Sequence, residues 1–319
     1  MVAQTKKKSS GHPAGKKNHS APNALVKPTP AMWIAGARIR TLPLAVAPVA
    51  LGTGAAALLV GGVGSLDWGL VLLCLAVALF LQIGVNYSND YSDGVRGTDE
   101  FRVGPPRLTG SGVANPKRVL AVALAFFALG ALAGIAIVVL TGQYWLLIPG
   151  ALAIAAAYFY TGGKRPYGYY GFGEVFVFLF FGVVATVGTT YIVAGTFDTI
   201  AIYASIAAGA IACAVLMVNN IRDIEQDRVA KKRTLAVLIG NRASRIVFVV
   251  FLAVAYAVLF YFSLLFPLAP LVYFTLLLTL PAAIITLTAK TSKELILALK
   301  LTSFAGLLFG LGLGAAIAF

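Results

Sequence analysis

The chain has 319 residues, of which 60% are hydrophobic and only 11% are charged. A soluble domain of this size carries about 25% charged residues, so the composition excludes a water-soluble globule. The formal net charge is +14, and its distribution along the chain decides whether it indicates a nucleic-acid partner or a membrane surface.

The first 30 residues are rich in Lys, Ser, Pro and Asn and show no hydrophobic periodicity. We predict that residues 1–30 form a disordered basic cytoplasmic tail. Both histidines, His12 and His19, lie in this tail. The remaining domain, residues 31–319, therefore offers no histidine as a general base, haem ligand or metal ligand.

Nine apolar blocks follow the tail, and each is long enough to be read as a membrane span. They show none of the apolar–polar alternation of barrel strands, so we interpret them as helices. The fold class is thus predicted to be an all-α polytopic membrane protein with nine transmembrane helices. The blocks cover residues 39–63, 68–87, 119–140, 144–160, 174–193, 200–220, 246–262, 268–288 and 295–318.

The charges test this topology. All 25 Lys and Arg residues lie before or at the start of the first span, or in and around the even-to-odd loops, whereas the opposite face carries only Asp67 and Asp198. Positive residues mark the cytoplasmic side, so the N-terminus is predicted to be cytoplasmic and the C-terminus outside. The positive charge then faces the lipid bilayer and its anionic head groups, and no nucleic-acid partner is expected.

A short internal repeat joins the second and sixth spans. Residues 85–93 read VNYSNDYSD and residues 218–227 read VNNIRDIEQD, each with an Asp four residues after the Val-Asn pair. Both copies end a long apolar helix on the predicted cytoplasmic side. The repeat suggests two four-helix halves, helices 1–4 and 5–8, followed by helix 9, with the active site between the halves.

Most of the acids gather at these two helix ends, where helical periodicity places Asn86, Asn89, Asp90 and Asp93 on one face. Asn219, Asp223 and Asp227 share a face of the sixth span. Carboxylate and amide oxygens suit Mg²⁺ or Ca²⁺, and nearby bases suit phosphate oxygens. A solvated acidic cap is the alternative interpretation. The clustered acids are Asp90, Asp93, Asp99, Glu100, Asp223, Glu225 and Asp227, and the bases are Arg96, Arg102, Arg107, Lys164, Arg165, Lys231, Lys232 and Arg233.

These segments resemble those of a known family. NDYSDGVRGTD at 89–99, DIEQD at 223–227 and YTGGKRP at 160–166 resemble the motifs of the UbiA superfamily of intramembrane prenyltransferases. RTLPLAVAPV at 40–49, RVGPPRLTGSG at 102–112 and residues 219–240 are similar to its menaquinone-pathway branch, which prenylates 1,4-dihydroxy-2-naphthoate. The resemblance covers the whole membrane body. Most members have a further Asp at the place of Gly97, whereas here the acid follows at Asp99.

The resemblance implies Mg²⁺-dependent transfer of a polyprenyl group from its diphosphate to the naphthoate, with decarboxylation to demethylmenaquinone. It also implies a bacterial cell membrane, with the active site facing the cytoplasm. Two ions are expected, one on Asp90 and Asp93 and the other on Asp223 and Asp227. Expected substrate ligands are Asn86, Asn89, Asn219, Arg102, Arg107, Lys164, Arg165 and Lys232, with Tyr160 beside the allylic cation and Arg40 on the acceptor carboxylate.

Two alternatives stay open from the sequence. A sister enzyme of the same family would use another aromatic acceptor, such as 4-hydroxybenzoate or homogentisate. A cation-linked transporter would use the acids as an ion path, but its charges are expected near the membrane midplane, where this chain has none. Glu174 begins the fifth span and is interpreted as a partner of the helix dipole, with a catalytic role as the alternative. The oligomeric state and the prenyl chain length are not predicted.

Overall fold

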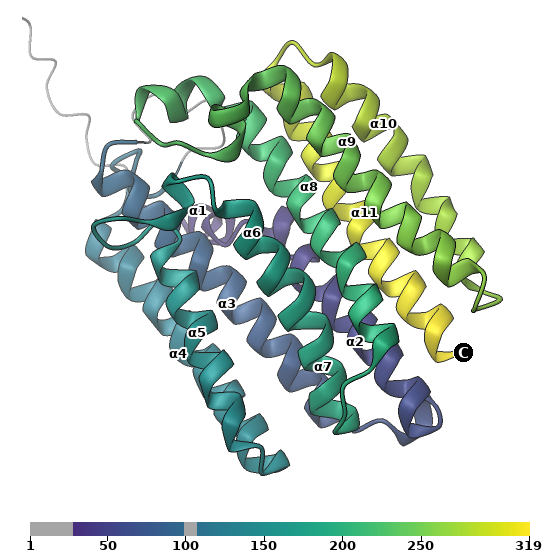
Figure 1. The fold of residues 1–319 in the computed structure, drawn as a ribbon. Coiled ribbons are helices and arrows are strands. Elements are labelled where there is room, and N and C mark those ends of the chain that lie inside the picture. The colour runs from purple at the N-terminus through teal and green to yellow at the C-terminus, as the bar shows by residue number, and fades with distance from the viewer. Residues whose placement is uncertain (1–27, 99–106) are drawn as a thin grey trace, which may run out of the picture.

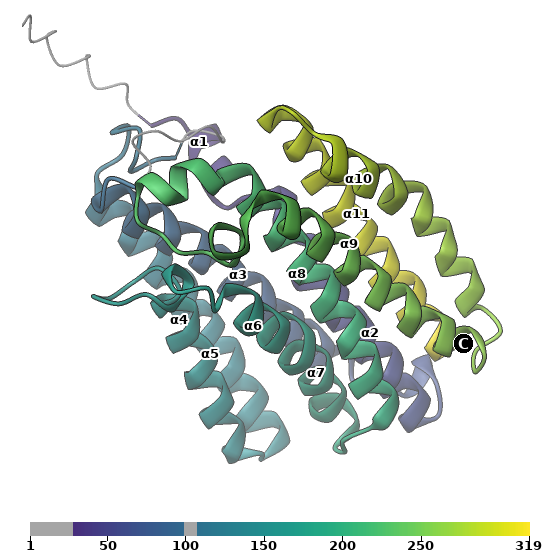
Figure 2. The ribbon, with the colours of Figure 1, turned by 45° about the horizontal axis from the view of Figure 1, so that its top comes forward.

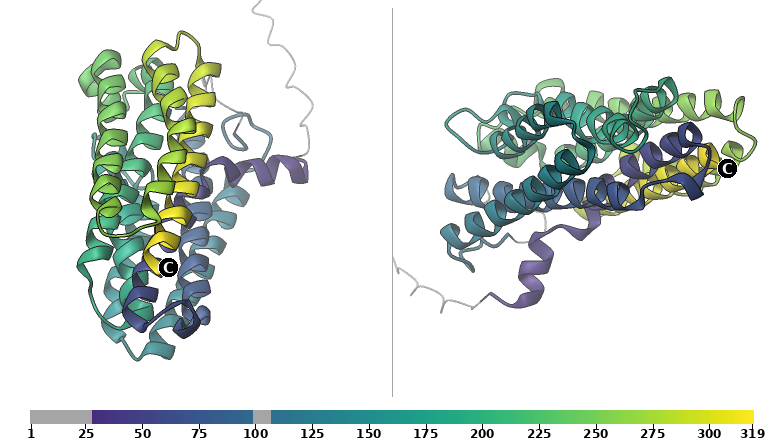
Figure 3. Two further views of the ribbon diagram at one scale, coloured as in Figure 1. Left: turned by 90° about the vertical axis from the view of Figure 1, so that its right-hand side faces the viewer. Right: turned by 90° about the horizontal axis from the view of Figure 1, so that it is seen from below.

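The computed structural model describes residues 28–98 and 107–319, and all regular structure within these ranges is helical (Figure 1). The predicted tail lies outside the described residues except for its last three. The short helix α1 (Pro30–Gly36) lies across the bundle axis (Figure 3). A hydrogen bond connects it to the bundle: the Tyr87 hydroxyl donates to the Trp33 carbonyl of α1 at 2.5 Å.

Eight described helices are long and apolar enough to cross a membrane. They are α2 (Pro43–Val60), α3 (Trp68–Val95), α4 (Pro116–Thr141), Gly173–Ala194, α8 (Thr199–Val229), α9 (Leu235–Ser263), Ala269–Thr288 and α11 (Ser292–Ala318). Gly173–Ala194 comprises α6 (Gly173–Val177), a π-helical segment (Phe178–Val184) and α7 (Ala185–Ala194). Ala269–Thr288 comprises a 3-10 segment (Ala269–Thr275) and α10 (Leu276–Thr288).

The predicted fourth span is the exception. Its apolar helix covers only Tyr144–Phe159, within which α5 is Leu147–Phe159. A straight crossing needs about 20 residues. The structure therefore supports eight of the nine predicted spans by length and composition, and the ninth crossing stays a prediction.

Polar caps explain where several helices begin. The two acids that the sequence places on the face opposite the basic loops are both N-caps. Asp67 accepts from the amides of Gly69 and Leu70 at the start of α3. Asp198 accepts from the amide of Ala201 at the start of α8. These carboxylates satisfy amides that have no partner within the helix, so they serve local structure.

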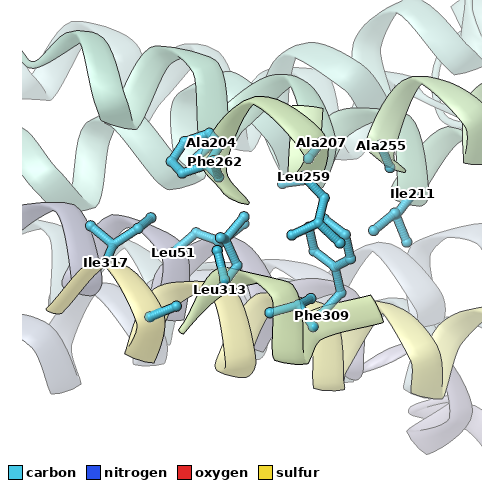
Figure 4. Close-up of a cluster of buried hydrophobic side chains, with 14 of the residues drawn as sticks. Leu51, Ala204, Ala207, Ile211, Ala255, Leu259, Phe262, Phe309, Leu313 and Ile317 are labelled. Carbon is cyan, nitrogen blue, oxygen red and sulfur yellow. The ribbon is translucent and has the colours of Figure 1, made fainter. Parts of the chain in front are cut away.

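The helices pack in two layers, seen end-on in Figure 3. One contains α2, α3 and α11, and the other contains α6 to α9. Between them lies an apolar core in which Leu51 of α2 and Leu313 of α11 meet Ile211 of α8 and Leu259 of α9 (Figure 4). At the contact of α2 with α11, a Cβ on Gly54 would collide with the Gly314 backbone. Small residues thus let these two helices approach closely, as is common in membrane bundles.

Helix length places the polar helix ends. At 1.5 Å per residue, α3 and α8 are about 40–45 Å long, longer than the roughly 30 Å hydrocarbon core. Their C-terminal ends lie on the same side of the bundle as α1 (Figures 1 and 2). The acids at these ends therefore lie at one membrane boundary.

Candidate active site

The C-terminal ends of α3 and α8 meet at one lysine. Lys232 Nζ lies 3.9 Å from Asp93 Oδ2 and 3.8 Å from Asp227 Oδ1. Both aspartates are buried. Two acids from the two copies of the internal repeat thus form a single buried pair, with an ammonium group between them.

The Asp93 carboxylate also accepts two side-chain hydrogen bonds. Arg107 Nη1 donates to Asp93 Oδ2 at 2.7 Å, and the Tyr169 hydroxyl donates to Asp93 Oδ1 at 2.6 Å. Desolvation and the charge of Asp93 both raise the pKa of Tyr169 far above its ordinary value. The phenol therefore keeps its proton and remains a hydrogen-bond donor to the carboxylate.

The acids of α8 have partners close by in the chain. Thr234 Oγ1 donates to Asp227 Oδ2 at 3.3 Å. Asp223 lies one turn before Asp227 on the same helix face and forms an ion pair with Arg222 at 2.5 Å. Asp223 and Asp227 therefore face the same region, as the sequence predicted.

The side chains of Asp90 and Asn86 instead form hydrogen bonds to the backbone of neighbouring segments. The Asp90 oxygens accept from the backbone amides of Leu108 and Thr109 at 2.9 and 2.8 Å. Asn86 Nδ2 donates to the carbonyl of Ala37 at 2.9 Å. Asn89 lies nearer the acid pair. Its side chain accepts from Thr161 Oγ1 at 2.7 Å, and its carbonyl accepts from Arg107 at 2.9 Å.

The segment after α5 covers the α3 end. Arg96 donates to the carbonyls of Thr161 and Gly163, and its guanidinium lies 5.4 Å from the centre of the Tyr169 ring. Tyr160 is half-buried beside this segment. Desolvation, followed by the negative charge of Glu174, raises the pKa of Tyr160, so this phenol also stays neutral. Lys164 and Arg165 are exposed.

The remaining predicted residues divide into three groups. Arg40 is exposed on a 3-10 turn (Ile39–Thr41), and its carbonyl accepts from Ser303 Oγ at 2.6 Å. Asn219 is half-buried on α8. Arg102 and its acidic neighbours, Asp99 and Glu100, lie outside the described residues. The structure thus brings together Asp93, Asp227, Asp223, Asn89, Arg107 and Lys232.

Sequence reasoning missed two residues of the site. Tyr169 donates to Asp93 from 76 residues away, and no spacing rule connects them. Asn220, rather than Asn219, is the buried asparagine of α8, and its side chain donates to Glu174 at 3.0 Å. The sequence VNN at 218–220 contains both asparagines, and only the rotation of α8 about its axis determines which of them is buried.

The donor set can be tested against a magnesium ion. Within residues 28–98 and 107–319, no three His, Cys, Asp or Glu side chains form a ready metal group. Mg²⁺ commonly binds one or two carboxylates and completes its shell with water and substrate phosphate oxygens. Asp93 and Asp227, with Asp223 one turn away, supply such carboxylates, so the oxygen-only site fits this ion.

Comparison with known proteins agrees with this geometry. Residues 49–304 match the UbiA prenyltransferase family. The chain is 48% identical over 289 residues to the 1,4-dihydroxy-2-naphthoate octaprenyltransferase of Mycobacterium tuberculosis, covering 91% of this chain and 97% of that relative. It is 40% identical over 219 residues to the Escherichia coli protein of the same name, covering 67% of this chain and 70% of that one.

A solved structure confirms the fold. The UbiA homolog from Archaeoglobus fulgidus, bound to DMAPP and Mg²⁺, superimposes with a TM-score of 0.60. The match covers 89% of this chain and 99% of that chain at 18% sequence identity. The family match and the named relatives favour an enzyme over the transporter alternative. The chain therefore belongs to the UbiA prenyltransferase family.

Proposed function

We propose that this prenyltransferase moves a polyprenyl group from its diphosphate to 1,4-dihydroxy-2-naphthoate in a Mg²⁺-dependent reaction. The observation that carries the proposal is the pair formed by Asp93 and Asp227, with Lys232 and Arg107 beside it. Acids and bases gathered at one membrane boundary suit a substrate with a polar diphosphate head and an apolar tail. The names of the relatives, at 48% and 40% identity, support the naphthoate as acceptor.

The side chains have distinct roles in this proposal. Asp93 and Asp227 hold magnesium, with Asp223 available from the same face of α8. The bound ion neutralises the charge that develops on the leaving diphosphate. Lys232 and Arg107 supply positive charge to the diphosphate oxygens. Arg102, Lys164 and Arg165 are further candidates for these oxygens, and Asp90 supports the site through the backbone of Leu108 and Thr109.

The chemistry then requires a dry, aromatic environment. As the bond between the prenyl carbon and the diphosphate oxygen breaks, its electron pair leaves with the diphosphate. The ring of Tyr160 can stabilise the resulting allylic cation. The acceptor ring attacks the first prenyl carbon, and loss of the acceptor carboxylate as carbon dioxide gives the hydroquinone form of demethylmenaquinone. Exclusion of water protects the cation from conversion to an alcohol.

The orientation in the membrane follows from the basic loops. We propose that the acid pair faces the cytoplasm of a bacterial cell membrane, because the loops around it carry Lys and Arg. Single-cysteine labelling of intact cells tests this. A cysteine at Lys164 should be protected from a membrane-impermeant reagent, and a cysteine at Phe197, on the opposite side, should react.

The reaction itself can be tested with purified protein in nanodiscs. The assay contains Mg²⁺ and a radiolabelled polyprenyl diphosphate, with 1,4-dihydroxy-2-naphthoate, 4-hydroxybenzoate or homogentisate as acceptor. We expect product only with the naphthoate, and its loss with EDTA and in Asp93→Asn and Asp227→Asn. Product with another acceptor would replace the proposed substrate. Full activity in both variants would reject the acid pair as the active site.

A further inference from the structure

Glu174 is a buried carboxylate that the proposed reaction does not yet use. It lies at the start of α6, and the residue is 5% exposed. Asn220 Nδ2 donates to its Oε1 at 3.0 Å, whereas Oε2 is buried and has no hydrogen-bond partner among the described residues. Leaving a buried polar atom without a partner is destabilising. An oxygen held in this state is available to a ligand.

No cation compensates this carboxylate in the described part of the chain. The ion pairs among the described residues involve the acids Asp93, Asp223, Glu225 and Asp227, and none of them involves Glu174. The nearby thiol of Cys213 donates only to the Glu174 backbone carbonyl, at 3.1 Å. A carboxylate placed among apolar helices without a cation is costly, and such groups in a membrane bundle usually serve function.

The position of Glu174 relative to the acid pair is set by α8. Asn220 and Asp227 are seven residues apart on one face of this helix, which corresponds to about 10 Å along its axis. Asn220 is the more deeply placed of the two, since α8 ends at Val229. Asn220 therefore holds the carboxylate about two helical turns below the acids proposed to hold magnesium.

Tyr160 lies beside the start of α6, which carries Glu174. A Cβ added to Gly173 would lie 3.4 Å from the Tyr160 hydroxyl, so this phenol reaches the backbone beside Glu174. The next residue, Thr161, donates from its hydroxyl to Asn89, which lies one turn before Asp93 on α3. Tyr160, the residue proposed to stabilise the allylic cation, thus lies next to the segment that carries Glu174.

We propose that Glu174 is the general base that accepts the proton of a ring hydroxyl on the aromatic acceptor, with Asn220 fixing the carboxylate. This inference rests on the proposed prenyl transfer. The hydroxyl proton passes to Glu174, and the oxygen electron pair moves into the ring. The adjacent ring carbon forms a bond to the first prenyl carbon. The bond from that carbon to oxygen breaks, and its electron pair leaves with the diphosphate.

The same residue can complete the reaction with the naphthoate. Attack from the ring carbon that carries the carboxylate leaves a ketone next to that carbon, so the intermediate is a β-keto acid. Carbon dioxide leaves, and the electrons of the broken bond restore the aromatic ring and its oxygen anion. That oxygen takes the proton back from Glu174. The carboxylate is regenerated, and the step needs no outside acid.

The test compares Glu174→Gln with Cys213→Ala, a matched control at the same helix contact that leaves the carboxylate in place. General-base catalysis typically contributes 10²–10⁴-fold, so kcat of Glu174→Gln should fall by about 10²-fold or more. The KM for the polyprenyl diphosphate should change little, because Glu174 lies away from the diphosphate ligands. Cys213→Ala should keep near wild-type kcat, and Glu174→Asp should recover part of the loss.

A second measurement separates base catalysis from a structural role. The acceptor series includes a ring-halogenated 1,4-dihydroxy-2-naphthoate with a more acidic hydroxyl, assayed at a pH above the pKa of that hydroxyl so that it is ionised. Glu174→Gln should recover most of its loss with this acceptor. The ratio of the two rates is taken on one protein sample, so incomplete folding of the variant cancels.

The outcomes distinguish the two proposals. Wild-type transfer combined with an unchanged kcat in Glu174→Gln overturns the role of Glu174 and leaves the proposed function standing. An equal loss with ionised and neutral acceptors also overturns it. If the wild type prefers a different hydroxylated acceptor, the naphthoate assignment fails and the Glu174 comparison is made on that acceptor. No transfer to any acceptor rejects both.

Discussion

The C-terminal ends of α3 and α8 carry related acidic sequences, yet they are held in different ways. At the end of α3, the partners come from distant segments. Asp90 binds the amides of Leu108 and Thr109, and Asp93 binds Arg107 and, 76 residues away, Tyr169. At the end of α8, Asp223 binds its neighbour Arg222, and Asp227 binds Thr234 and Lys232.

The difference indicates that the same acidic motif can either hold surrounding loops in place or present its acids to a ligand. The α3 end organises the loops that surround the site, so its acids support the structure as well as the proposed metal. At the α8 end, the partners Arg222, Thr234 and Lys232 lie within seven residues of their acids along the chain, so local contacts hold the acids in place. Substitutions at the two ends are therefore expected to match in activity and to differ in stability.

The largest effects should come from Asp93→Asn and Asp227→Asn. Each should lower kcat by about 10³-fold, comparable to the removal of a group that stabilises transition-state charge. Asp93→Asn should also destabilise the protein by about 3 kcal/mol, because its ion pair with Arg107 is buried on both sides. Asp227→Asn should cost less, because Lys232 is 3.8 Å away, beyond hydrogen-bond distance, and the amide oxygen can still accept from Thr234.

Transfer assays and SDS titration in mixed micelles measure the two quantities separately. Equal loss of stability in both variants would remove the distinction between the helix ends. Retained activity in either one would remove that acid from the proposed metal site.

A smaller but more selective effect is expected at Asp90. Asp90→Ala removes two hydrogen bonds from backbone amides to a charged acceptor, each worth about 1.5–3 kcal/mol, and should destabilise the protein by about 3 kcal/mol. Asp90→Asn keeps one acceptor oxygen and should be milder. If Asp90 acts through the loop, the Mg²⁺ concentration for half-maximal activity stays near the wild-type value in Asp90→Asn. A marked rise would show that Asp90 also binds an ion, as the sequence predicted.

The helices and the meeting of the two acidic ends were predictable because both depend on local patterns. Apolar runs give eight of the spans, and the repeat places both motifs on one side. The partners of Asp90 are backbone amides, which carry no sequence signature. Tyr169 reaches Asp93 through tertiary packing. Asn219 and Asn220 differ by one residue, which is a rotation of about 100° on a helix and moves a side chain to another face.

A moderate effect is expected from Tyr169→Phe, which removes the 2.6 Å hydrogen bond to Asp93. A hydrogen bond to a charged group is worth about 1.5–3 kcal/mol, so activity should fall by about tenfold. Because desolvation and Asp93 raise the pKa of Tyr169, the wild-type phenol does not ionise near its ordinary value of about 10. The rate ratio of wild type to Tyr169→Phe should thus be constant from about pH 7 to pH 10. A ratio that falls toward one at the alkaline end would indicate an ionising phenol.

The smallest effect should come from the exposed side of the α8 end, where Arg228 and Glu225 form an ion pair at 3.0 Å. Their side chains are 57% and 74% exposed, so water competes with the pair. Arg228→Ala should change the free energy of unfolding by less than about 0.5 kcal/mol and leave kcat unchanged. SDS titration and the transfer assay check both. A loss of activity in Arg228→Ala would mean that the exposed charges of the α8 end also contribute to the site, in addition to its buried acids.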